Sequence, residues 1–227
     1  MSFTEHNVNG LIYDTSDVIT AAGSGAVHAF TTRHGGVSPA PYDSLNFADN
    51  KGDTSENLLE NYRRLGEAVG FDASRAVGCR LITLYDPTSR SIGAVHAGWR
   101  GTASGIALKA AVSMMSCYGA DPYTLRAAIG PSIGKCCFET DSDVADAFFA
   151  LLDPAMDERI EKRSDKYHID LKAINRLWLL RAGIDPSRID VHPDCTKCHP
   201  ERYWSHRAMG DRRGGMAAMI CLTEDAL

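Results

Sequence analysis

Hydrophobic residues recur at the three- and four-residue spacing of an amphipathic helix in four parts of the chain. The first helix is predicted after Asp53 or Thr54, both suitable N-cap residues, and ends at Gly70. Three further helices are expected at residues 102–118, 141–152 and 170–183. In the helices at 102–118 and 141–152, the side chains expected to face the core are Ile106, Ala110, Met114, Tyr118, Val144, Phe148 and Leu152.

Short apolar runs bounded by turn residues predict strands between these helices. The strands are expected at residues 26–32, 81–85, 91–96, 125–129, 189–192 and 216–222, with a weak edge strand near residues 11–13. The charged residues 157–166 are expected to form a solvated connection. Because no repeat or linker interrupts this series, the sequence predicts a single α+β domain over residues 1–227, with mixed or antiparallel sheets flanked by helices.

Composition narrows the class of protein. Of the 227 residues, 44% are hydrophobic and 23% are charged, which is typical of a globular domain. The net charge of −5 gives no basic surface for nucleic acid or an anionic membrane, so we expect neither as a partner. No apolar run approaches membrane-spanning length and no export signal precedes the first strand, so a cytoplasmic location is expected. Seven cysteines without such a signal favour reduced thiols over disulfides, and nothing in the sequence sets the oligomeric state.

Residues 96–101, His-Ala-Gly-Trp-Arg-Gly, stand between a predicted strand and a predicted helix. The imidazole of His96 can bind a metal or move a proton, and the guanidinium of Arg100 offers a fork of donors to an anion. Cys79 lies seventeen residues earlier, on the neighbouring strand of a predicted hairpin, so the two side chains can converge. A Cys–His pair suits zinc or copper, and it equally suits a thiolate nucleophile beside a base.

Other candidate site residues follow the remaining strands. Arg33 precedes two glycines in a position suited to binding phosphate or carboxylate, and Asn46 follows in the same loop. Cys136 and Cys137 are neighbours, so their thiols are expected to point to opposite sides, with one of them facing the site.

The segment Cys195-x-x-Cys198-His199 matches a haem-attachment pattern, but that reading requires an exported protein. A zinc knuckle would need two more ligands, for which His192, His199 and His206 are close enough in sequence.

Taken together, four segments resemble the motifs of one family, the YfiH-like proteins. This family is also called peptidoglycan editing factor or laccase-like multicopper polyphenol oxidase. The segments occur in the family's order within a core of about residues 26–222, and the resemblance implies the family's α+β fold, which is similar to that of cytotoxic necrotising factor. The matching segments are residues 30–46, 96–101, 129–139 and 195–207.

This resemblance implies a purine nucleoside enzyme that cleaves adenosine, inosine and methylthioadenosine with phosphate, with some adenosine deamination. It assigns Cys79 and His96 as ligands of zinc, or of copper, and places Arg33, Asn46, Arg100 and Cys136 at the catalytic site. Two departures stand out. The family's Gln-Val-His-Gly motif, which carries its first metal-ligand histidine, has no counterpart before Cys79, and residues 214–216 read Gly-Gly-Met instead of Gly-Arg-Met.

The main hypothesis is metal-assisted phosphorolysis, with Arg33 and Arg100 binding phosphate and a metal at Cys79 and His96 polarising an oxygen or activating water. Three alternatives stay open. They are a copper-dependent polyphenol oxidase, a Cys–His hydrolase acting on peptidoglycan-type amides, and a family member that binds a nucleoside or a protein without turnover.

Overall fold

The first sheet is built from both ends of the chain. The computed structural model describes residues 2–23, 25–72 and 82–223. Its first sheet has the order β1-β2-β3-β11, and every neighbouring pair is antiparallel. The strands are β1 (Phe3–Val8), β2 (Leu11–Ser16), β3 (Ala26–Thr31) and β11 (Ala218–Leu222), and helix α1 (Asp17–Thr20) connects β2 to β3. The expected strand at residues 11–13 is therefore confirmed, but it is not an edge strand, because β1 pairs with its outer side.

The second sheet has the order β10-β6-β4-β5. Its strands are β4 (Ile82–Asp86), β5 (Ser91–Val95), β6 (Arg126–Ile129) and β10 (Ile189–Val191), the last preceded by a 3-10 turn at Pro186–Arg188. Strand β10 runs parallel to β6, and β4 runs antiparallel to both of its neighbours, β5 and β6. It follows that β5, β6 and β10 all point the same way.

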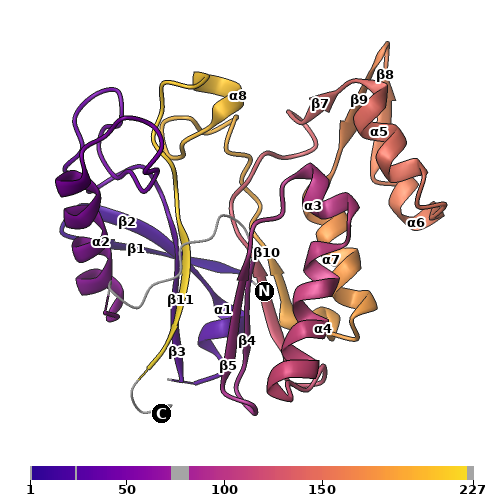
Figure 1. Cartoon of the computed structure of the whole chain (residues 1–227), viewed down its shortest axis with the longest axis horizontal. Helices are drawn as coiled ribbons and strands as arrows, with labels where there is room; N and C mark the ends of the chain where they lie inside the picture. The colour runs from indigo at the N-terminus through magenta and orange to yellow at the C-terminus, as the bar shows by residue number, and fades with distance from the viewer. Residues whose placement is uncertain (1, 24, 73–81, 224–227) are drawn as a thin grey trace.

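The two sheets pack face to face, and helices cover their outer faces, so the body of the protein has four layers (Figure 1). Side chains alternate between the two faces of a strand, which divides each strand between two cores. In β3, Ala29 faces the helix side and Phe30 enters the core between the sheets, where it meets Tyr85 and Ala128 of the second sheet.

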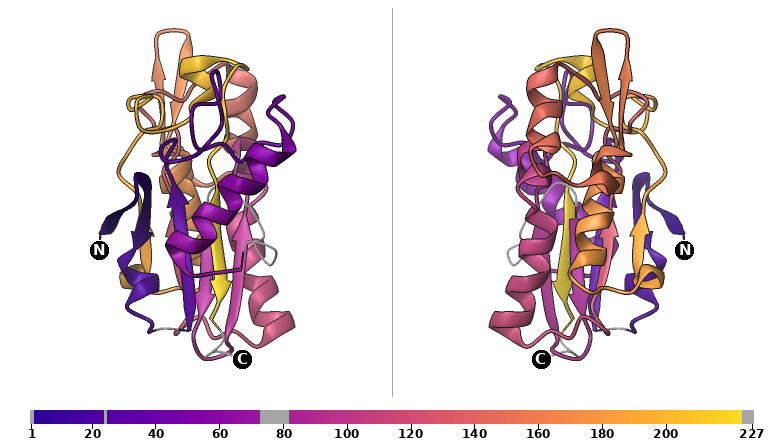
Figure 2. Two further views of the ribbon diagram at one scale, coloured as in Figure 1. Left: turned by 90° about the vertical axis from the view of Figure 1, so that its left-hand side faces the viewer. Right: turned by 90° about the vertical axis from the view of Figure 1, so that its right-hand side faces the viewer.

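Helix α2 (Ser55–Val69) covers the first sheet, and helices α4 (Ile106–Tyr118) and α7 (Leu171–Arg181) cover the second (Figure 2). The hydroxyl of Thr54 accepts a hydrogen bond from the backbone of Asn57, and Gly70 ends α2 in the left-handed conformation, as predicted.

The helix expected at residues 102–118 is instead two helices, α3 (Trp99–Ala103) and α4. Gly105 separates them with φ of 73°, a conformation that a continuous helix cannot contain. The buried residues of α4 are Ala107, Ala111 and Met114. Tyr118 is the last residue of the helix, before the C-cap Gly119, and is 65% exposed, so the expectation that it faces the core is wrong.

A third, smaller sheet with the order β7-β9-β8 projects beyond the second sheet, at the upper right of Figure 1. It contains β7 (Glu139–Thr140), β8 (Ile160–Arg163) and β9 (Lys166–Ile169), and it packs with α5 (Ser142–Phe149) and α6 (Pro154–Asp157). The charged residues 157–166 are thus largely a hairpin and not the expected loop. Helix α5 ends before Leu152, which is 88% exposed, so its predicted inward position is also wrong.

The predicted class, α+β with mixed and antiparallel sheets flanked by helices, is confirmed. Within the described ranges, no helix has both the length and the apolar character needed to cross a membrane.

Candidate functional site

Three of the segments that carry polar motifs follow strands of the second sheet and lie at the same end of that sheet. Because β5, β6 and β10 are parallel to one another, the segments that follow them leave the sheet on the same side. The chain before β11 arrives at the same place, since Arg213, Gly215 and Met216 line one cavity with His96, Ser132 and Thr196. Loops held at a sheet edge in this way are common positions for binding groups.

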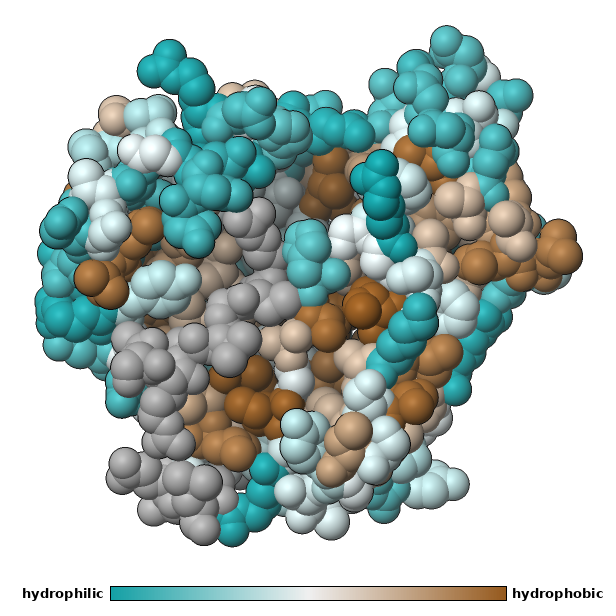
Figure 3. Space-filling view, viewed as in Figure 1, coloured by the Kyte–Doolittle hydropathy of each residue, from teal (hydrophilic) through white to brown (hydrophobic). Residues whose placement is uncertain are grey.

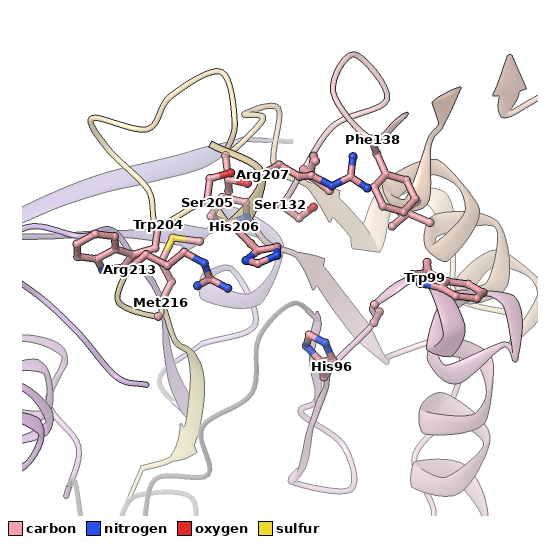
Figure 4. Close-up of a pocket in the computed structure, with 17 residues that line it drawn as sticks. His96, Trp99, Ser132, Phe138, Trp204, Ser205, His206, Arg207, Arg213 and Met216 are labelled. Atoms are coloured by element: carbon pink, nitrogen blue, oxygen red, sulfur yellow. The ribbon is translucent and has the colours of Figure 1, made fainter. Parts of the chain in front are cut away.

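These segments enclose a cavity of about 330 Å³. Its wall combines aromatic and aliphatic side chains with histidines and arginines (Figure 4). On the face seen in Figure 3, brown hydrophobic residues lie in a hollow between the upper left and upper right parts of the molecule. The lining residues that bear on function are His96, Trp99, Ser132, Phe138, Trp204, His206, Arg207, Arg213 and Met216.

His96 directly follows β5 and lines the cavity, and its role as a metal ligand stays a prediction. A Cβ added to Gly98 would lie 3.3 Å from His96 Nε2, so the imidazole packs against bare backbone at this position. The predicted metal partner Cys79 lies outside the described residues. Among the residues that are described, His96 belongs to no group of three His, Cys, Asp or Glu side chains able to share a metal ion. The described residues alone therefore do not complete a three-ligand centre at His96.

Arg33 lies behind the cavity wall and is not one of the lining residues. Its guanidinium donates hydrogen bonds to the backbone oxygens of Pro200 and Asp43, at 3.0 and 3.1 Å, and stacks 3.9 Å from the centre of the Trp204 ring. Trp204 in turn donates its indole N–H to the backbone oxygen of Leu45, at 2.8 Å. The structure thus places Arg33 where it supports Trp204, and its catalytic assignment stays a prediction.

Asn46 and Arg100 also lie outside the cavity lining. Asn46 is fully buried, and its side-chain oxygen accepts hydrogen bonds from the backbones of Ala48 and Gly215, at 2.9 and 2.8 Å. It therefore fixes the segment that enters the cavity at Gly215. Arg100 is exposed and stacks on the neighbouring Trp99 ring at 4.2 Å, and its role at the site remains a prediction as well.

Cys136 and Cys137 do not point to opposite sides, so that expectation is wrong. Their sulfurs lie 3.7 and 3.5 Å from the sulfur of Cys198. The physical reason is a tight turn, in which the backbone N–H groups of Cys137 and Phe138 both donate to the oxygen of Gly134 and curl the chain. With Cys195, these thiols form a group of four whose sulfurs all lie within 4.8 Å of one another.

Burial and the contacts within the cysteine group shift the pKa values of its thiols. Burial and the neighbouring thiols raise the pKa of Cys136 to about 12. Burial also acts to raise the pKa of Cys195, but hydrogen bonds from the backbone of Gly134, Cys198 and Lys197 outweigh it and lower the pKa to about 7. The three histidines considered as zinc-knuckle ligands have other partners: His192 lies 3.4 Å from Asp14, His199 lies 3.2 Å from Glu201, and His206 lies 3.2 Å from the oxygen of Gly210.

Three lining residues, Ser132, Arg207 and Arg213, were not predicted as site residues, and a fourth, His206, was considered only as a possible zinc-knuckle ligand. Ser132 is 9% exposed, and its hydroxyl has no hydrogen-bond partner among the residues that the structure describes. Arg207 donates to the backbone oxygen of Glu139 at 2.8 Å and packs over the Phe138 ring. The sequence could have indicated Ser132, His206 and Arg207 as site residues, since each stands in a segment that resembles a family motif.

Arg213 stands near the position where the family motif has an arginine at residue 215. At Gly215 a Cβ would lie 2.9 Å from Ala48 Cβ, so the backbone there leaves no room for a side chain without movement. Arg213, two residues earlier, lines the cavity instead.

Comparison with known proteins agrees with the motifs. The family model described as multi-copper polyphenol oxidoreductase laccase matches residues 27–80 and 76–223. The chain is 31% identical to the purine nucleoside phosphorylase YlmD of Geobacillus stearothermophilus, covering 89% of this chain and 92% of the relative. That alignment spans 252 positions, more than the 227 residues of this chain, so the relative has residues without a counterpart here. The two family matches meet at residues 76–80, where the Gln-Val-His-Gly motif is missing from the sequence.

Two further similarities extend this result. The adenosine deaminase RL5, from an unknown prokaryotic organism, is 37% identical over 71% of this chain and 63% of its own length. The crystal structure of YlmD from Geobacillus stearothermophilus superposes with a TM-score of 0.84 at 29% identity, covering 98% of this chain and 99% of that one. The chain therefore belongs to the YfiH/YlmD family, whose model is described as multi-copper polyphenol oxidoreductase laccase.

Proposed function

We propose that this protein is a purine nucleoside phosphorylase and that the cavity beside His96 binds the nucleoside and phosphate together. The observation that carries the proposal is the combination of groups around one cavity. Two arginines, Arg207 and Arg213, line the same cavity as the rings of Trp99, Phe138 and Trp204. A guanidinium is the side chain best suited to bind phosphate, and aromatic faces stack on a purine. The volume of about 330 Å³ falls within the range of small-molecule sites.

The reaction sets clear requirements for these residues. A phosphate oxygen attacks C1′ of the ribose while the bond from C1′ to the purine nitrogen breaks, and that bond's electron pair leaves with the base. Negative charge on the attacking phosphate must be held close to the sugar, which a pair of oriented arginines does at low entropic cost. Packing over Phe138 and the bond to Glu139 orient Arg207 while using one nitrogen of a group that carries five donors.

The departing purine must receive a proton, and among the described residues His96 and His206 are the imidazoles that line the cavity. Ser132 offers a buried hydroxyl for a polar atom of the nucleoside, which would satisfy a group that has no partner among the described residues. Arg207 and Arg213 line the cavity whereas Arg33 and Arg100 do not, so we assign phosphate binding to the first pair.

A metal held by Cys79 and His96 remains part of the proposal, and its chemistry would be Lewis-acid polarisation of an oxygen or activation of water. The second of these would also give deamination of adenosine. The similarity to a protein named adenosine deaminase, at 37% identity, supports testing that second activity.

The test is to incubate the purified protein with adenosine, inosine or methylthioadenosine, with and without phosphate and with zinc restored. We expect free base and ribose 1-phosphate (or its methylthio analogue) only when phosphate is present. Inosine formed from adenosine would report deamination. Absence of base release under all conditions would overturn the proposal. In that case, copper-dependent oxidation of a phenolic dye, or an amidase activity that thiol alkylation abolishes, would identify the other enzyme classes.

A further inference from the structure

We propose that Cys136, Cys137, Cys195 and Cys198 bind one zinc ion, and that this ion fastens together two loops that form adjacent parts of the cavity wall. The site is separate from the predicted metal position at Cys79 and His96. It brings together two adjacent cysteines after β6 and a Cys-x-x-Cys pair after β10, which lie about sixty residues apart in sequence.

The sulfur geometry fits a tetrahedral zinc thiolate. A zinc–sulfur bond of about 2.3 Å and tetrahedral angles place the sulfurs about 3.8 Å apart. The sulfur of Cys198 lies 3.7 Å from that of Cys136 and 3.5 Å from that of Cys137, and all four sulfurs lie within 4.8 Å of one another. The ligands therefore need only small movements to close on an ion at their centre.

The close approach of the four sulfurs is unfavourable without a cation. Cys136 and Cys198 are exposed, yet four polarisable sulfurs gather at one point, an arrangement that gains little as neutral thiols and is repulsive as free thiolates. A divalent cation resolves this repulsion. The backbone N–H of Gly134 donates to the sulfur of Cys195 at 3.2 Å, and such a bond stabilises negative charge on a metal-bound sulfur.

The two loops already meet beside the sulfurs. Ser132 and Cys195 form a parallel β-bridge, in which the backbone N–H of Thr196 donates to the oxygen of Ser132 at 3.1 Å. The buried ammonium of Lys172, from helix α7, donates to the backbone oxygens of the three residues of the second loop that precede Cys195, namely His192, Pro193 and Asp194. The segment that carries Cys195 is thus held in place independently of the metal.

The proposed zinc site lies next to residues that line the cavity. Ser132 and Phe138 flank the first cysteine pair and Thr196 follows Cys195, and all three line the cavity. Four protein sulfurs leave no open coordination position, which is typical of a structural zinc site and not of a catalytic one. The ion would therefore hold the wall in position without contacting the substrate.

The experiment compares metal content in variants of the full chain, purified without chelator and measured by inductively coupled plasma mass spectrometry. In the Cys79→Ser/His96→Ala background, which removes the predicted site, we expect about one zinc per chain. Adding Cys198→Ser should remove it, whereas Cys117→Ser, at an exposed thiol of α4, should leave it bound. Cobalt taken up by the same background should show the intense visible absorption of a tetrahedral thiolate site.

A second measurement covers the case in which Cys198→Ser does not fold. In the Cys79→Ser/His96→Ala protein, a chelator should release the zinc, make the four cluster thiols reactive with a thiol reagent, and lower the melting temperature by about 5 °C. The proposal fails if zinc content does not depend on Cys198. It also fails if the freshly purified protein contains no zinc and peptide mass spectrometry finds Cys198 in a disulfide with Cys136 or Cys137.

Discussion

The guanidinium carbon of Arg33 lies 3.9 Å from the centre of the Trp204 ring, so a residue of the N-terminal motif supports a residue of the cavity wall. The side chain of Arg33 is 19% exposed, and backbone oxygens of Asp43 and Pro200 accept its N–H groups. This contact connects two segments that are distant in sequence, residues 33–43 and 200–204. It explains an arginine next to a glycine pair without requiring it to touch substrate.

Arg33→Met should therefore act first on stability. We expect the free energy of unfolding to fall by about 1–3 kcal/mol, because the hydrogen bonds of a charged group and its stacking on an aromatic ring are lost. Arg100→Met is the matched control, since that exposed arginine should change stability by less than about 0.5 kcal/mol. Urea unfolding measures both. A large rise in the KM for phosphate at unchanged stability would instead establish the direct role predicted from the sequence.

Arg213→Gln tests phosphate binding at the cavity. Removing a guanidinium that contacts phosphate should raise the KM for phosphate roughly 10- to 100-fold, which corresponds to about 1.5–3 kcal/mol for a hydrogen bond to a charged group. The neighbouring Arg212 is exposed and does not line the cavity, so Arg212→Gln is a control of identical chemistry. Steady-state kinetics at varied phosphate separate the two. Equal effects of both substitutions would contradict the assignment.

Ser132→Ala removes a buried hydroxyl that has no partner within the described part of the chain. Stability should stay within about 0.5 kcal/mol or rise slightly, because an unsatisfied buried group is removed. The kcat/KM for the nucleoside should fall about 3- to 10-fold if this hydroxyl binds substrate. Thr83→Val is the matched control, since the Thr83 hydroxyl is equally buried without a described partner but lies in β4, outside the cavity lining. An activity loss in both variants would show a packing effect only.

Acid should weaken the fold through His28. Burial, with a smaller contribution from the charge of His6, lowers the pKa of His28 to about 4, and its Nε2 accepts a hydrogen bond from the backbone of Ser16 at 2.7 Å. Between pH 6.5 and 4 the unfolded chain binds a proton at this residue and the folded protein does not, so stability falls as the pH is lowered through this window. The expected loss is about 2–4 kcal/mol, with a steepest slope of about 1.4 kcal/mol per pH unit.

His28→Gln keeps a hydrogen-bond acceptor near the same position but does not titrate. Urea unfolding of both proteins at pH 7 and pH 4.5 should show a smaller pH dependence in the variant. Identical pH dependence in the two proteins would remove His28 as the cause.

Much of the fold could be predicted from local pattern. The cap at Thr54, the end of α2 at Gly70 and the hairpin of β4 and β5 depend on neighbouring residues, and the structure confirms them. The misassigned segments depend on long-range packing. The charged residues 157–166 contribute to a hairpin that pairs with β7, and Tyr118 is exposed because it is the last residue of α4, where the helix ends at Gly119.

The same division holds for the site. By itself, the sequence determined which segments carry chemistry, since histidine, arginine and cysteine motifs at strand ends can be recognised locally and matched to a family. Only the tertiary structure decided which of these side chains meet. It directed Arg33 toward Trp204, placed Arg213 on the cavity wall and brought Cys136 and Cys137 to Cys198. The reason is that these distances depend on strand order and loop curvature, which couple residues far apart in the chain and leave no periodic signal in it.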